Sequence, residues 1–154
     1  MAVYFLKQYL TVASVVKEED DEVIATSKRK ITILYGTTTG TARNFATALS
    51  KRISQSSTNI PVTKIVDLAD YDEDSLDKED IVLFICSTWT NGCCPESCAF
   101  FFDWLKDFSC DFRVSKDHLA KLSYAAFGLG GEIYNKNYCK VVSGINSSSI
   151  YRSE

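Results

Sequence analysis

Four short apolar runs, each bounded by a turn or a loop, limit the folds that this chain can adopt. The first run, ITILY at 31–35, is rich in β-branched residues and ends at Gly36, as expected for a strand buried on both faces. IVLFICS at 81–87 is the most hydrophobic run and is expected near the centre of a sheet. Two further strands are expected over residues 61–68 and 122–130.

Amphipathic segments separate these expected strands. Residues 41–53 and 95–108 carry apolar side chains at helical spacing, and a further helix is expected to begin within 134–145. Strands that alternate with helices through short connections favour a parallel sheet with helices on both faces. The sequence therefore predicts an α/β fold with a doubly wound parallel sheet.

Ligands bind such sheets beyond the carboxyl ends of the strands, where the strand order reverses. Three loops are expected at that edge, at residues 36–42, 87–95 and 128–138. The functional residues should therefore lie in these loops.

The first loop, GTTTGTA from Gly36 to Ala42, leaves a strand and opens a helix. It brings four hydroxyl groups and a row of backbone N–H groups to the N-terminus of that helix, which favours an anion. The loop lacks the lysine of a Walker A motif, so it suits a phosphate monoester that is bound and not hydrolysed. A threonine-rich helix cap is the alternative interpretation.

The second and third loops add aromatic side chains. Trp89 is expected at a loop tip, where it offers a flat face to an aromatic ligand, and Gly92 permits close approach of the backbone. Tyr134 is the second aromatic residue at this edge. In the alternative interpretation both aromatic side chains pack on the core. Together the three loops predict a site for a flat, phosphorylated heterocycle.

Three segments resemble the flavin-binding loops of flavodoxins and diflavin reductases. They are YGTTTGTARNFA (35–46), STWTNG (87–92) and YAAFGLG (124–130). A longer segment, CDFRVSKDHLAKLSYAAFGLG (110–130), is similar to the flavodoxin domain of the eukaryotic tRNA 4-demethylwyosine synthases. The resemblance extends over residues 31–145 and implies a flavodoxin-like fold with FMN as its cofactor.

The resemblance also implies the residues of the cofactor site. The first loop would hold the phosphate, the second would border the flavin ring, and the third would complete the pocket. The implied residues are Thr37, Thr38, Thr39, Gly40, Thr41, Ala42, Ser87, Thr88, Trp89, Thr90, Asn91, Gly92, Leu129, Gly130, Gly131, Glu132, Ile133, Tyr134 and Tyr138.

In the resembled synthases, the flavodoxin domain supplies electrons to the iron–sulfur cluster of a radical-SAM domain. That domain modifies N1-methylguanosine in tRNA-Phe during wybutosine synthesis. The resemblance therefore implies an electron-transfer domain that is not a complete enzyme alone and meets tRNA only through its partner. Two alternatives stay open, the FMN domain of a diflavin reductase and a non-catalytic fragment. The last strand and helix of the family fold are expected to be missing after residue 145.

Length, charge and the chain ends complete the prediction. Residues 31–145 are expected to form one domain, preceded by a mobile, charged lead at 1–30 and followed by an unstructured tail at 146–154. The net charge of −3 argues against a nucleic-acid-binding surface. The apolar N-terminal segment contains Lys7 and is shorter than the roughly 20 residues that span a bilayer. We expect a cytoplasmic protein, with endoplasmic-reticulum association through that segment as the alternative.

Cysteines and acidic residues give weaker signals. Cys86 is expected to be a small buried hydrophobe. Cys94 and Cys98 match half of the radical-SAM cluster motif, but Phe101 stands at its third cysteine, so no metal site is expected. A redox-sensitive thiol is the alternative there. The acidic run at 67–80 predicts a solvated surface, with a docking patch for a basic electron-transfer partner as the alternative.

Overall fold

A four-stranded parallel sheet forms the centre of the molecule. The computed structural model describes residues 29–56, 61–115, 117–131, 137 and 139–147. The strands lie in the order β2-β1-β3-β4. They are β1 (Ile31–Gly36), β2 (Val62–Asp67), β3 (Ile81–Ser87) and β4 (Ser123–Leu129). All four strands predicted from the sequence are confirmed, and the most hydrophobic of them, β3, is internal.

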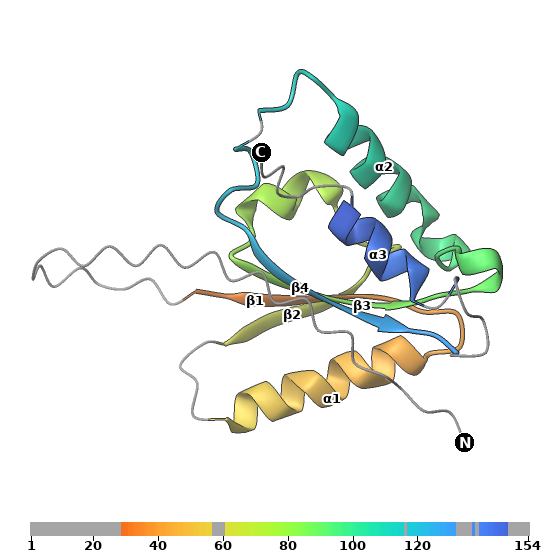
Figure 1. Cartoon of the computed structure of the whole chain (residues 1–154). Coiled ribbons are helices and arrows are strands. Elements are labelled where there is room, and N and C mark those ends of the chain that lie inside the picture. Colours follow the sequence, from red (N-terminus) through yellow and green to blue (C-terminus); the bar gives the residue numbers. More distant parts are fainter. Residues whose placement is uncertain (1–28, 57–60, 116, 132–136, 138, 148–154) are drawn as a thin grey trace, which may run out of the picture.

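Helices cover both faces of this sheet, as Figure 1 shows. The long helix α1 (Thr41–Gln55) packs on one face. The other face carries α2, α3 and the 3₁₀ helix η1, with bounds Ala99–Cys110, Lys140–Ser147 and Glu73–Lys78. Two short 3₁₀ helices, η2 (Thr90–Gly92) and η3 (Glu96–Cys98), lie between β3 and α2. The predicted doubly wound α/β fold is therefore confirmed.

Alternation along the buried strands divides the core into two layers. Ile33 of β1 and Ile85 of β3 belong to the cluster beneath α1. Their neighbours Leu34 and Phe84 belong to the cluster on the α2 and α3 face. Because successive side chains of a strand point to opposite faces, a strand covered on both sides needs an uninterrupted apolar run.

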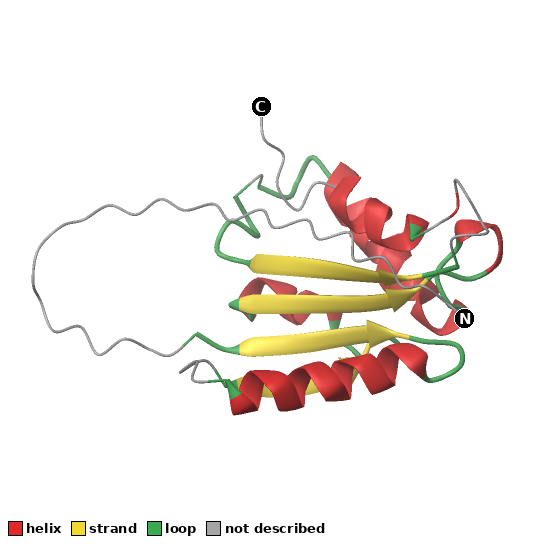
Figure 2. Cartoon of the chain, turned by 60° about the horizontal axis from the view of Figure 1, so that its bottom comes forward, coloured by secondary structure: helices red, strands yellow, loops and turns green. Residues whose placement is uncertain are grey.

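The strand order fixes where a ligand site can form. The chain passes from β1 to β2 on one side and then crosses to β3 on the other side of β1. All neighbouring strands are parallel, and the arrowheads visible in Figure 2 point to one edge of the sheet. The reversal between β1 and β3 therefore places the loops after β1, β3 and β4 side by side.

One helix boundary differs from the sequence prediction. The second helix is expected from Pro95, but Pro95 is extended (φ −52°, ψ 142°) and α2 begins only at Ala99, after η3. The third helix, expected to begin within 134–145, begins at Lys140, directly after Cys139, whose left-handed backbone (φ 49°) cannot belong to a right-handed helix. Residues 132–136 and 138 lie outside the described part.

The acidic run contains one residue that the sequence interpretation placed wrongly in solvent. The Glu79 side chain is only 9% exposed and lies 2.7 Å from Lys64 Nζ. It also accepts a hydrogen bond of 2.6 Å from the hydroxyl of Thr32, which is fully buried in β1. The Tyr71 hydroxyl donates to its second oxygen at 3.4 Å, and burial together with the Glu79 charge raises the pKa of Tyr71. We call Thr32, Lys64, Tyr71 and Glu79 the paired polar cluster.

Two observations concern the expected membrane association and the expected end of the sheet. No helix within the described ranges is long and apolar enough to cross a membrane. The described residues, which end at Ser147, include no fifth strand after β4. Of the predicted lead at 1–30 and the predicted tail at 146–154, residues 1–28 and 148–154 lie outside the described part, whereas residues 146 and 147 belong to α3.

Candidate functional site

A cavity of about 220 Å³ lies at the carboxyl edge of the sheet. Three loops contribute to its wall, as the sequence predicted. The residues that line it are Thr38, Thr39, Thr41, Ser87, Thr88, Trp89, Leu129, Gly130 and Gly131. All nine belong to the predicted set, and none carries a charge.

The conformation of the loop after β1 depends on a glycine and a threonine. Gly40 has φ 86°, a left-handed conformation that side chains rarely adopt. The Gly40 N–H donates to Thr37 Oγ1 at 2.9 Å, so the Thr37 hydroxyl closes the loop on itself and does not line the cavity. The Thr39 and Thr41 hydroxyl oxygens lie 3.1 Å apart on the cavity wall. Two adjacent hydroxyls can serve one anionic group.

The N-terminus of α1 opens at the same place. Its N-cap is Gly40, which has no side chain to cap the helix, and its first turn contains no acidic residue. Arg43 Nε donates to the Tyr35 hydroxyl at 3.0 Å, and the Arg43 guanidinium lies 3.9 Å from Asp67. This cation is therefore engaged away from the cavity. The helix dipole, backbone N–H groups and hydroxyls remain to attract an anion.

The loop after β3 is tied to the loop after β4. Thr88 N–H donates to the Leu129 carbonyl at 2.7 Å, which extends the β3–β4 pairing past Ser87. Trp89 N–H donates to the Cys93 carbonyl at 2.7 Å and closes a turn in which Asn91 and Gly92 have positive φ. The Trp89 side chain is 51% exposed at the cavity rim. It is thus presented to a ligand and is not folded into the core.

One buried hydroxyl on the cavity wall lacks a partner. Thr88 Oγ1 has almost no solvent contact, and no described residue makes a hydrogen bond with it. Leaving a polar group buried and unpaired costs about 1–3 kcal/mol. A ligand whose polar edge reaches this hydroxyl, through a small movement of the loop after β3, would remove this cost. The cavity therefore fits a molecule with an aromatic face, polar edge atoms and an anionic end, which is the chemistry of FMN.

The end of β4 lies close to the start of α3. Gly128 leaves no room for a side chain, since a Cβ atom there would lie 2.8 Å from Cys139 Cβ. The Cys139 thiol donates to the Gly128 carbonyl at 3.3 Å. This contact fixes the direction in which Gly130 and Gly131 leave the sheet. No sequence motif pointed to Cys139, because its role depends on a contact between two elements.

Several predicted site residues lie elsewhere or outside the described part. Ala42 is fully buried in the core beneath α1, and Thr37 and Gly40 shape the first loop. Asn91 and Gly92 shape the second loop, where a Cβ at Gly92 would meet Lys140 Cδ at 2.6 Å. The side chain of Thr90 is not described, and neither are the predicted residues Glu132, Ile133, Tyr134 and Tyr138.

Of the thiols near this site, Cys86 and Cys98 are buried, Cys94 is half-buried and Cys93 is exposed. Cys86 is fully buried, as predicted, and burial raises the pKa of the Cys94 and Cys98 thiols. A raised pKa reduces the thiolate fraction and therefore the reactivity of a cysteine. Within the described ranges, no group of three or more His, Cys, Asp or Glu side chains could hold a metal ion.

Comparison with known proteins identifies the family. The flavodoxin family model matches residues 33–147. This chain belongs to the flavodoxin family. Solved flavodoxin structures share its fold, among them a short-chain flavodoxin associated with a non-canonical PDU bacterial microcompartment. That structure has a TM-score of 0.59 and 20% identity, covering 78% of this chain and 73% of its own.

A second solved structure contains the cofactor that the sequence predicted. It is a Fusobacterium nucleatum flavodoxin mutant bound to flavin mononucleotide, with a TM-score of 0.63 and 11% identity. The match covers 82% of this chain and 66% of the other.

The flavodoxin domain is also similar to part of longer enzymes. The S-adenosyl-L-methionine-dependent tRNA 4-demethylwyosine synthase of Mus musculus is 36% identical over 121 residues, which cover 75% of this chain. The Arabidopsis thaliana synthase is 35% identical over 119 residues, which cover 77% of this chain. The chain spans only 16% and 18% of the length of these two relatives. The resemblance stated from the sequence is confirmed at the level of this domain.

Proposed function

We propose that this chain binds FMN at the edge between β1 and β3 and acts as an electron-transfer domain. The observation that carries the proposal is the uncharged cavity in which the unpaired Thr88 hydroxyl, the exposed Trp89 ring and the Thr39–Thr41 hydroxyl pair converge. Membership of the flavodoxin family supports the same cofactor.

Each part of the cavity has a separate task in this proposal. Thr39 and Thr41, with the N-terminus of α1, hold the phosphate group through hydroxyl and backbone donors. Trp89 covers one face of the ring and keeps water from it, and Thr88 donates to or accepts from a polar edge atom. Bound FMN supplies the capacity to accept and release electrons one at a time. The described residues of the wall carry no charge, so their contribution to the stability of the reduced cofactor comes from backbone and hydroxyl dipoles.

We further propose that the electron acceptor is the iron–sulfur cluster of a radical-SAM domain. The similarity to tRNA 4-demethylwyosine synthases supports this assignment. In this proposal the partner contacts N1-methylguanosine in tRNA-Phe, and the present chain does not contact the tRNA. The predicted roles of Glu132, Ile133, Tyr134 and Tyr138 in completing the pocket remain part of the same proposal.

The test uses the whole chain loaded with FMN and a radical-SAM domain prepared from a synthase without its own flavodoxin part. After chemical reduction of the chain and removal of excess reductant, the cluster should lose visible absorbance and cleave S-adenosylmethionine. The chain without FMN is the control and should leave the cluster oxidised. An oxidised cluster in the presence of the reduced, FMN-loaded chain would contradict the proposed acceptor while leaving flavin binding intact.

A further inference from the structure

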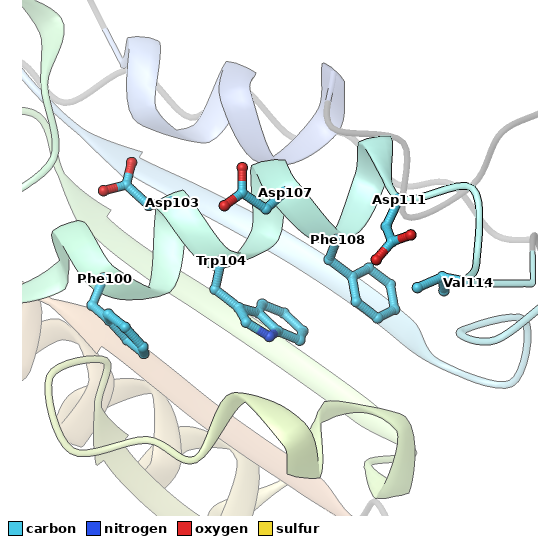
Figure 3. Close-up of a pocket in the computed structure, with 7 residues that line it drawn as sticks. All are labelled: Phe100, Asp103, Trp104, Asp107, Phe108, Asp111 and Val114. Atoms are coloured by element: carbon cyan, nitrogen blue, oxygen red, sulfur yellow. The ribbon is translucent and has the colours of Figure 1, made fainter.

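A groove runs along the outer side of α2, away from the cofactor cavity. Phe100, Trp104 and Phe108 follow one another at four-residue spacing along it, as Figure 3 shows. The groove has a volume of about 340 Å³ and shares no lining residue with the cavity at the carboxyl edge. Phe100 is 72% exposed, although it is a large aromatic side chain. Trp104 and Phe108 are half-buried, so the row presents one exposed ring beside two partly exposed ones, as expected of an interaction surface.

Two members of the aromatic row pack against other rings. The rings of Trp104 and Phe108 are stacked with centroids 4.9 Å apart, and the Trp104 ring centroid lies 6.0 Å from that of the fully buried Phe101. The His118 ring centroid lies 5.5 Å from that of Phe108. A partner that covers Trp104 and Phe108 would lose little entropy in ordering them, because both rings are already packed.

Acidic side chains flank the aromatic row on both sides. Asp103 and Asp107 of α2, with Asp111 directly after the helix, follow the same four-residue spacing and line the same groove. Across the aromatic row, η1 contributes acidic side chains to an adjoining cavity of about 60 Å³ that also contains Trp104 and Phe108. Those side chains are Glu73, Asp74 and Asp77.

Two of these carboxylates lie beside a basic side chain. Arg113 pairs with Asp111 at 2.7 Å and holds the pKa of that carboxyl at about 2. The His118 Nε2 lies 3.9 Å from Asp77. Among the described residues that line the two cavities, His118 alone can carry a positive charge. Glu73, Asp74, Asp103 and Asp107 therefore leave an anionic field around the apolar row.

We propose that this groove binds a basic amphipathic helix of a partner protein. Side chains four residues apart form parallel ridges on a helix, and the groove between two such ridges accepts the ridge of a second helix. Here one ridge is aromatic and the next is acidic. The matching helix carries large apolar side chains along its contact line, with Lys or Arg on both flanks. This surface is independent of flavin binding and goes beyond the proposed electron-transfer function.

The test measures binding of a labelled synthetic peptide to the whole chain by fluorescence anisotropy. The peptide has about 14 residues, so as a helix it spans about 21 Å, with leucine on one face and lysine on both flanks. Phe100→Ser and Asp107→Lys should each weaken binding by about tenfold, because one removes an apolar anchor and the other reverses a flanking charge. Added salt should weaken binding to the parent chain.

Matched controls separate the groove from general surface effects. Phe112 is 95% exposed but does not line the groove, and Asp70 is an exposed acid outside it. Phe112→Ser and Asp70→Lys should change the affinity by less than about twofold. The proposal is overturned if the peptide does not bind, if a version with glutamate in place of lysine binds equally, or if the groove variants bind like the parent. It is also overturned if the chain dimerises through this groove, seen as a dimer in sedimentation that Phe100→Ser abolishes.

Discussion

The cofactor cavity and the paired polar cluster each contain a buried threonine hydroxyl, but only the hydroxyl in the cluster has a hydrogen-bond partner among the described residues. Thr32, in β1, donates to Glu79 at 2.6 Å, and Lys64 lies on the other carboxylate oxygen at 2.7 Å. Thr88, just after β3, has a hydroxyl that no described residue satisfies. Both hydroxyls belong to threonines at ends of adjacent central strands. Without a ligand, the Thr32 hydroxyl is hydrogen-bonded and the Thr88 hydroxyl is not.

This difference separates residues that stabilise the fold from residues held ready for a ligand. A buried hydrogen bond contributes about 0.5–1.5 kcal/mol to stability, whereas an unpaired buried group costs about 1–3 kcal/mol. The paired polar cluster therefore adds to the free energy of unfolding. The unpaired Thr88 hydroxyl lowers the free energy of unfolding until a ligand supplies a hydrogen-bond partner.

The largest effect should come from the two hydroxyls assigned to the phosphate. Replacing Thr39 and Thr41 together with Ala should weaken FMN binding by about 3 kcal/mol or more, since each hydroxyl bond to a charged group is worth about 1.5–3 kcal/mol. Both side chains lie on the cavity wall, so chemical unfolding of the flavin-free chain should change little. Titration with riboflavin, which has no phosphate, provides the control. Equal losses for FMN and riboflavin would contradict the phosphate assignment.

A smaller effect, on stability and not on binding, is expected at Glu79. Glu79→Ala removes the partner of the buried Thr32 hydroxyl and of Lys64. Because Lys64 is 44% exposed and can be solvated, the expected loss is about 2 kcal/mol in urea unfolding, below the loss for a fully buried pair. FMN affinity should stay unchanged. A stability loss below ~0.5 kcal/mol would show that the cluster is solvated.

The sharpest comparison comes from two isosteric changes with opposite expected signs. Thr32→Val removes a paired hydroxyl and should destabilise the chain by about 1 kcal/mol. Thr88→Val removes an unpaired one and should stabilise the flavin-free chain by about 1 kcal/mol, while it weakens FMN binding. Urea unfolding without flavin measures both. Destabilisation by Thr88→Val would mean that this hydroxyl is already paired in the absence of ligand.

Much of the fold follows from local sequence patterns. The run IVLFICS at 81–87 is apolar at every position but the last, and only a strand covered on both faces requires that. The loop Gly36 to Ala42 combines glycine with hydroxyls at a helix start, so its place at the ligand edge was also predictable. Both features are encoded within a few neighbouring residues.

Other features depend on contacts between distant residues and could not be predicted. Glu79 belongs to an acidic run for which the sequence predicts a solvated surface. In the structure its carboxylate contacts Thr32 of β1 and Lys64 of β2. Helical spacing gives the apolar residues of 95–108 one common face, but in the structure Phe101 and Leu105 fill the core while Trp104 and Phe108 remain half-buried. The exposed groove of α2 follows from that division.

The central claim, an FMN site between β1 and β3, is tested most directly by titrating the unaltered chain with FMN and with riboflavin. Bound flavin is followed by its visible absorbance and by quenching of tryptophan emission, to which the exposed Trp89 contributes. We predict one FMN per chain and an affinity at least about 100-fold above that for riboflavin, because the phosphate gains two charge-assisted hydroxyl bonds. No binding of FMN, or equal affinity for the two flavins, would contradict the site described here.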